Sequence, residues 1–66
     1  MPLIQVTLIE GRSADQKAAL IHQLTEAAVH AIQAPRDSVR VILHEVPAAH
    51  WGVGGMAKSA PGPMPG

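Results

Sequence analysis

The sequence contains no cysteine, phenylalanine or tyrosine, and Trp51 is its one tryptophan. Without cysteine, the chain can form neither a disulfide nor a zinc–thiolate site, and it carries no thiol nucleophile. A single large aromatic side chain offers almost no platform on which nucleotide bases could stack. Five Lys and Arg residues balance five Asp and Glu residues, so the basic excess of phosphate-binding proteins is missing too. These absences argue against nucleic acid as a partner.

Long hydrophobic segments are also absent. No apolar run approaches the roughly 20 residues that span a bilayer, and the N-terminus lacks the basic segment and apolar core of a signal peptide. We therefore expect a soluble, cytoplasmic protein that does not enter a membrane. A chain of 66 residues buries only about 60% of its unfolded surface, and disulfides cannot compensate. We expect it to be stabilised as a homo-oligomer.

Two segments predict β-strands, because residues 2–9 and 38–46 are rich in β-branched side chains. Alternation places Ile4, Val6 and Leu8 on one face of the first strand. The odd-numbered residues form a mixed face that is too apolar for full exposure, so we expect a partner to cover it.

The intervening segment predicts a helix. Ser13 and Gln16 form a capping box, residues 17–32 are strong helix formers, and Pro35 ends the helix near residue 33. Lys17 and Glu26 are expected on its solvated side. The stripe expected to face the sheet has helical spacing and comprises Leu20, Leu24, Ala27, Ala28 and Ala31, with Ile21 and Ile32 at its edge.

The order strand, helix, strand predicts an α/β fold. Its unit is a β-α-β protomer with two parallel strands and a right-handed crossover. The run Gly52-Val53-Gly54-Gly55 favours a short C-terminal hairpin. We expect residues 1–58 to form one domain and the Pro/Gly-rich residues 59–66 to form a flexible tail.

Pro2 directly follows the initiator methionine. Aminopeptidases generally remove methionine before a small second residue, which would leave Pro2 as a free secondary amine. A free α-amino group has a pKa of about 7.7–8.0, and that of a proline amine starts somewhat higher. Cationic neighbours or desolvation lower such a pKa towards neutrality, where the amine can act as a general base. The alternative is that Pro2 is a common second residue with no role.

Two arginines stand at the ends of the predicted strands. Arg12 follows the first strand, and Arg40 lies among valines and isoleucines at the start of the second, where its charge must meet an anion or water. Arginine is suited to binding a carboxylate through two hydrogen bonds. The alternatives are an intersubunit salt bridge for Arg40 and a solvated loop position for Arg12.

The predicted topology restricts how these residues can meet. Parallel strands begin at the same edge of a sheet, so Pro2 and Arg40 should lie level. Arg12 lies beyond the far end of the first strand, close to 30 Å from Pro2 at about 3.3 Å per residue. If both serve one site, another subunit must supply Arg12.

Trp51 and the four histidines are the other side chains of interest. The Trp51 indole could form the wall of a pocket and exclude water; the alternative is an anchor for an interface or the core. The histidines make neither an H-x-x-x-H nor an H-E-x-x-H pattern, so we expect no metal site.

Four short motifs, taken together, resemble the 4-oxalocrotonate tautomerase family. Each is weak alone, but four in order at these spacings in so short a chain are specific, and they cover it from Pro2 to about residue 57. They are Met1-Pro2-Leu3-Ile4, Glu10-Gly11-Arg12-Ser13 followed by Gln16-Lys17, Ser38-Val39-Arg40-Val41, and His50-Trp51-Gly52-Val53-Gly54-Gly55.

This resemblance implies an enol–keto tautomerase that acts on a small carboxylate substrate, a 2-hydroxydienoate such as 2-hydroxymuconate, without a cofactor. It also implies a hexamer built as a trimer of dimers; from the residues alone, a hexamer, a dimer and a trimer all stay open. By resemblance, Pro2 is the general base and Arg40 binds the carboxylate and the 2-oxygen, stabilising charge there. Arg12 binds the far carboxylate, and Trp51 supplies the hydrophobic wall.

Two other functions stay open. On the same fold, a cationic Pro2 could act as general acid in the dehalogenation or hydration of a 3-haloacrylate. That reaction needs a carboxylate to activate water, and Glu10 and Glu45 are the only local candidates. Alternatively, the chain is a non-enzymatic oligomeric protein in which Arg12 and Arg40 make interface salt bridges.

Overall fold

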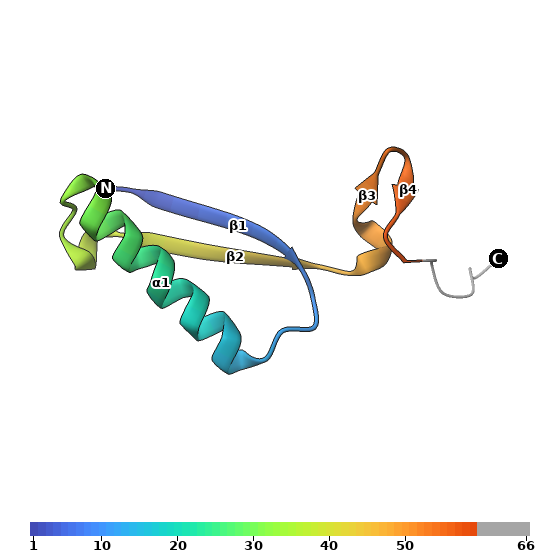
Figure 1. Cartoon of the computed structure of the whole chain (residues 1–66), viewed down its shortest axis with the longest axis horizontal. Coiled ribbons are helices and arrows are strands. Elements are labelled where there is room, and N and C mark those ends of the chain that lie inside the picture. The colour runs from blue at the N-terminus through green and yellow to red at the C-terminus, as the bar shows by residue number, and fades with distance from the viewer. Residues whose placement is uncertain (60–66) are drawn as a thin grey trace.

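A computed structural model of the chain, which describes residues 1–59, shows a two-stranded sheet with one helix packed on it (Figure 1). Strand β1 (Leu3–Ile9) leads into helix α1 (Ala14–Ile32), and strand β2 (Arg40–Val46) returns parallel to β1. Strands β3 (Gly52–Val53) and β4 (Met56–Ala57) form an antiparallel hairpin that stands away from the sheet (Figure 1). The predicted β-α-β architecture with a C-terminal hairpin is confirmed.

The tail that the sequence predicts over residues 59–66 lies, apart from its first residue, outside the described residues. Its flexibility and the domain boundary at residue 58 stay predictions. Within residues 1–59, no helix combines the length and the apolar character needed to cross a membrane.

The strand register brings the N-terminus level with the start of β2. Leu3 pairs with Arg40, and the pairing continues to Ile9 and Val46. One further backbone bond precedes the ladder, since the amide of Arg40 donates to the carbonyl of Pro2 at 3.0 Å. The predicted alignment of Pro2 with Arg40 is therefore present.

Helix α1 begins and ends where the sequence predicts. The Ser13 hydroxyl accepts from the Gln16 amide at 3.1 Å, and the Gln16 side chain accepts from the Ser13 amide at 3.0 Å, which completes the capping box. Asp15 adds negative charge to the first turn, where the helix dipole favours it. At the other end, Gln33 adopts a left-handed conformation with φ of 58°, a common way to end a helix.

The second strand begins later than the sequence predicts. Residues Arg36–Ser38 form a 3-10 turn, η1, and β2 starts at Arg40. The cause is local hydrogen bonding, because both the amide and the hydroxyl of Ser38 donate to the carbonyl of Pro35, at 2.9 and 2.7 Å. Serine side chains often favour turns over strands in this way.

The C-terminal hairpin has a two-residue turn. Gly54 and Gly55 link Val53 to its partner Met56, and both have positive φ, 59° and 88°. A two-residue turn with positive φ at both positions matches the right-handed twist of the flanking strands and strongly favours glycine. The glycine-rich run thus specifies the hairpin.

The helix contacts the sheet along a narrower stripe than the sequence predicts. Leu20, Leu24 and Ala28 are half-buried, whereas Ala27 and Ala31 are exposed. A sheet of two strands is narrow, because neighbouring strands lie only about 4.8 Å apart. It therefore covers only part of the apolar helix surface, and Val39 is the one buried hydrophobic residue in the described chain.

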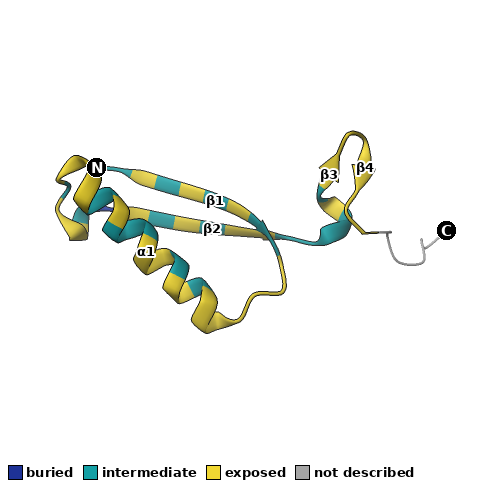
Figure 2. Cartoon of the chain, viewed as in Figure 1, coloured by how far each residue is buried: buried dark blue, intermediate teal, exposed yellow. Residues whose placement is uncertain are grey.

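The face of the sheet opposite α1 lies bare. Burial alternates along both strands (Figure 2), and the exposed positions include Leu3 and Ile42, which are 54% and 43% exposed. No helix or strand of residues 1–59 covers this face. A sheet normally buries its apolar side chains against a second layer, so an isolated chain leaves its core unfinished.

Candidate active site

The candidate residues form two groups at opposite ends of the sheet. Pro2 and Arg40 lie where the strands begin, and Arg12 and Trp51 lie beyond the ends of β1 and β2. The seven residues of β1 span about 23 Å at roughly 3.3 Å each. Within one chain, the two groups cannot contact one molecule the size of a six-carbon diacid.

At the first end, the Arg40 guanidinium is exposed and engaged by a single hydrogen bond in the described chain. Its Nη1 donates to the carbonyl of Asp37 at 2.6 Å. Because a guanidinium carries several N–H donors in a fixed fork, most of them are left for an anion. Pro2, whose carbonyl bonds to the Arg40 amide, is half-buried, and Met1 in front of Pro2 is 88% exposed, so an aminopeptidase can reach Met1.

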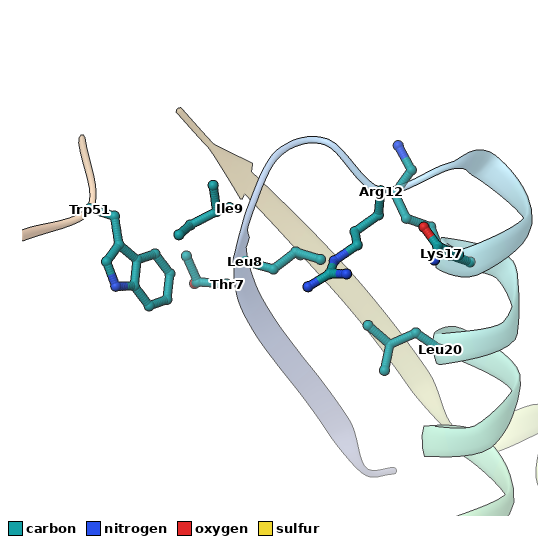
Figure 3. A pocket seen from close by; sticks show the side chains of 8 residues that line it. Thr7, Leu8, Ile9, Arg12, Lys17, Leu20 and Trp51 are labelled. Carbon is teal, nitrogen blue, oxygen red and sulfur yellow. The ribbon is translucent and has the colours of Figure 1, made fainter. Parts of the chain in front are cut away.

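At the second end lies a cavity of about 460 Å³, which is within the usual range for small-molecule sites. In Figure 3, Trp51 stands with Thr7 and Ile9 on one side of β1, and Arg12 lies on the other side with Leu8. The cavity thus combines an apolar wall with positive charge, which suits a small organic anion. Its lining comprises Thr7, Leu8, Ile9, Arg12, Gln16, Lys17, Leu20 and Trp51.

The two cations of this cavity differ in their pairing. Lys17 Nζ lies 2.9 Å from Glu45 Oε1, and both side chains are about one-third exposed. No hydrogen bond or ion pair within residues 1–59 engages the guanidinium of Arg12. Arg12 is therefore the cation that can bind an incoming carboxylate, while the charge of Lys17 is balanced. Sequence reasoning placed Lys17 on the solvated side of the helix and missed both its partner and its place in the cavity.

Neither candidate for a water-activating carboxylate lies beside Pro2 in the chain. Glu45 is paired with Lys17 and lies five residues along β2 from Arg40, a separation of about 17 Å. Glu10 is exposed just after the far end of β1. Within one protomer, the arrangement that hydration of a haloacrylate requires is thus missing.

A second ion pair joins the helix to the turn before β2. Arg36 Nε and Nη2 donate to the two carboxylate oxygens of Glu26 at 2.6 and 2.9 Å. This hydrogen bonding is the main reason that the pKa of Glu26 lies below its ordinary value of 4.5 and that the pKa of Arg36 is raised. The Glu26 carboxylate, expected on the solvated side of the helix, is instead only 23% exposed.

This pair predicts an acid-dependent contribution to stability. Because the pKa of Glu26 is lowered by folding, its ionised form stabilises the folded state above about pH 4.5, and this contribution is lost as the pH falls through the lowered pKa. Glu26→Gln is therefore expected to reduce the melting temperature at neutral pH, with a difference that shrinks towards pH 3. Thermal unfolding at a fixed protein concentration tests this, and a difference that stays constant with pH would contradict it.

Comparisons with known proteins agree with the fold and with the four motifs. A family model described as "Tautomerase enzyme" matches residues 2–60. The chain is 72% identical over 60 residues to a probable tautomerase of Ralstonia nicotianae, covering 91% of this chain and 86% of that protein. It is 46% identical over 57 residues to a 2-hydroxymuconate tautomerase of Comamonas testosteroni, covering 86% and 90% of the two chains.

A comparison with a solved structure points to the same family. The heterohexamer 4-oxalocrotonate tautomerase from Chloroflexus aurantiacus superposes with a TM-score of 0.85 at 46% identity, covering 88% of this chain and 94% of that one. Sequence and fold thus agree over nearly the whole described chain, and the predicted resemblance is confirmed. The chain belongs to the tautomerase family and is an enzyme of the 4-oxalocrotonate tautomerase type.

Proposed function

We propose that this tautomerase converts a 2-hydroxydienoate such as 2-hydroxymuconate into its keto form without a cofactor. The observation that carries this proposal is a cavity lined by both Trp51 and Arg12, whose guanidinium has no ion pair or hydrogen bond within residues 1–59. Such a cavity suits one end of an unsaturated dicarboxylate. Relatives named 2-hydroxymuconate tautomerase, 46% and 45% identical to this chain, support the choice of substrate.

In the proposed reaction, Pro2 moves one proton. After removal of Met1, its amine takes the proton of the substrate's 2-hydroxyl group and delivers it to a distal carbon of the dienol. Negative charge develops on the 2-oxygen during this transfer. Arg40 lies level with Pro2 in the sheet; its free donors stabilise this charge and also hold the adjacent carboxylate. Because the proton that Pro2 takes is returned to the substrate at another atom, the reaction is an isomerisation without oxidation or reduction.

The distal carboxylate is bound by Arg12 of another protomer. The length of β1, about 23 Å, supports this, because Pro2 and Arg12 of one chain lie at opposite ends of the strand. The bare face of the sheet, with Leu3 and Ile42 exposed, provides an apolar surface for a second copy. We therefore infer a homo-oligomer, either a hexamer built as a trimer of dimers or a dimer. The heterohexamer of the Chloroflexus relative favours the hexamer.

The test is ultraviolet monitoring of 2-hydroxymuconate ketonisation, after intact mass has shown that Met1 is absent. We expect turnover on the order of 1–10³ per second, the usual range for enzymes. A rate no faster than the uncatalysed reaction would overturn the substrate assignment. Halide release from a 3-haloacrylate, measured in parallel, would then identify the alternative chemistry.

A further inference from the structure

We propose that Glu26 and Arg36 are positioning residues, whose ion pair holds the turn that presents Arg40 to the substrate. The inference rests on the proposed function, in which Arg40 binds the carboxylate and the 2-oxygen. Neither residue touches the substrate. They act through three consecutive contacts, from the helix to the turn, from the turn to Arg40, and from Arg40 to Pro2.

The first contact fixes the turn to the helix. Arg36 is the first residue of η1, and both hydrogen bonds of its side chain go to Glu26 on α1, at 2.6 and 2.9 Å. Two parallel bonds between a guanidinium and a carboxylate fix orientation as well as distance. In the described chain, these are the only side-chain hydrogen bonds between α1 and η1, so they are the polar side-chain contacts that tie the turn to the helix.

The second contact runs from the turn to the guanidinium of Arg40. The carbonyl of Asp37, the middle residue of η1, accepts from Arg40 Nη1 at 2.6 Å. The turn is closed by the bond from the Val39 amide to the Arg36 carbonyl at 3.2 Å. A displacement of Arg36 therefore moves the carbonyl that orients Arg40.

The third contact joins Arg40 to the catalytic end of β1. The Arg40 amide donates to the Pro2 carbonyl at 3.0 Å. Between the turn and Arg40 lies Val39, the one buried residue of the described chain, which keeps the backbone of this segment in place. Turn, Arg40 and Pro2 thus form one continuous unit at the amino end of the sheet, near the C-terminal half of α1 (Figure 1).

The first experiment compares Arg36→Met with wild type in 2-hydroxymuconate ketonisation. We expect kcat/KM to fall about tenfold, because small displacements of a positioned group have large effects, up to about 100-fold, on rate. His30→Gln is the matched control, because His30 lies 3.8 Å from the same Glu26 carboxylate but makes no hydrogen bond to the turn; its kcat/KM should stay at the wild-type value. If Arg36→Met does not fold, Arg36→Lys keeps the charge, loses the fork and should lower kcat/KM about threefold.

The second experiment separates positioning from general loss of structure. If Arg36 acts through Arg40, then Arg36→Met should have no further effect on kcat/KM in an Arg40→Ala background, because the two effects share one path. If the losses of kcat/KM in Arg36→Met and Arg40→Ala add fully in the double variant, the inference is wrong. It is also wrong if Arg36→Met keeps the wild-type kcat/KM although Arg40→Ala is inactive. Wild-type activity of Arg40→Ala itself would instead show that the proposed role of Arg40 is wrong.

Discussion

Replacing Pro2 by alanine is expected to lower kcat for 2-hydroxymuconate ketonisation by about 10²–10⁴-fold, the usual contribution of a positioned general base. The variant still has an N-terminal amine after loss of Met1, but that amine is primary and is no longer held in place by the pyrrolidine ring. Its pKa and its direction both change. The fold should survive, because the atom of Pro2 that bonds to Arg40 is its carbonyl oxygen, which alanine keeps.

The controls for this result concern the N-terminus and the assembly. Intact mass must show that Met1 is absent from both proteins, because a retained Met1 converts the nitrogen of Pro2 into an amide with no proton affinity near neutral pH. Circular dichroism and sedimentation should show the same fold and oligomer. Under those conditions, equal kcat values for the variant and wild type would refute the amine as the base.

Replacing Arg12 by alanine is expected to lower kcat/KM for 2-hydroxymuconate by about 10–100-fold, mainly through a higher KM. A hydrogen bond to a charged group contributes about 1.5–3 kcal/mol, which corresponds to this range. Stability should change little, because no ion pair or hydrogen bond in residues 1–59 depends on the Arg12 guanidinium. Steady-state kinetics and thermal unfolding of the same protein preparation measure the two effects.

A substrate control makes this second result specific. With 2-hydroxypenta-2,4-dienoate, which has no distal carboxylate, the same substitution should change kcat/KM little. An equal fall with both substrates would place Arg12 elsewhere in the mechanism. Dissociation of the oligomer in Arg12→Ala would instead favour the interface salt bridge that a non-enzymatic role requires.

Much of the fold can be predicted because its signals are local. The helix start follows from the side chains of Ser13 and Gln16, which bond to each other's backbone amides. The parallel register follows from the length of the connection and the alternation of apolar residues. The start of β2 could not be predicted, because Ser38 has neighbours suited to a strand but bonds back to Pro35.

The ion pairs could not be predicted for a different reason. Lys17 and Glu45 are 28 residues apart, and Glu26 and Arg36 are 10 apart. These separations exceed the three or four residues at which helical neighbours interact, so each pair forms only once α1 has packed against β2 or the turn before it. Sequence reasoning therefore assigned Lys17 and Glu26 to the solvent.

The candidate site, too, could be predicted in part and not in full. The sequence predicts Pro2, Arg12 and Arg40 as site residues, because the position of each gives its amine or its charge a chemical use. The cavity lining depends on the folded chain, and Thr7 and Gln16 carry no sequence signal for it. The structure in turn separates Pro2 from Arg12, so one chain does not complete the site that its own sequence indicates.

The most direct test of this account is to mix two inactive or impaired variants, Pro2→Ala and Arg12→Ala, under conditions in which protomers exchange. If each site takes Pro2 from one protomer and Arg12 from another, equal mixing should give both native residues to about a quarter of the sites. Activity towards 2-hydroxymuconate should then rise to about a quarter of the wild-type value. Activity that stays at the average of the two separate variants, after mass spectrometry has shown exchange, would contradict a site shared between protomers.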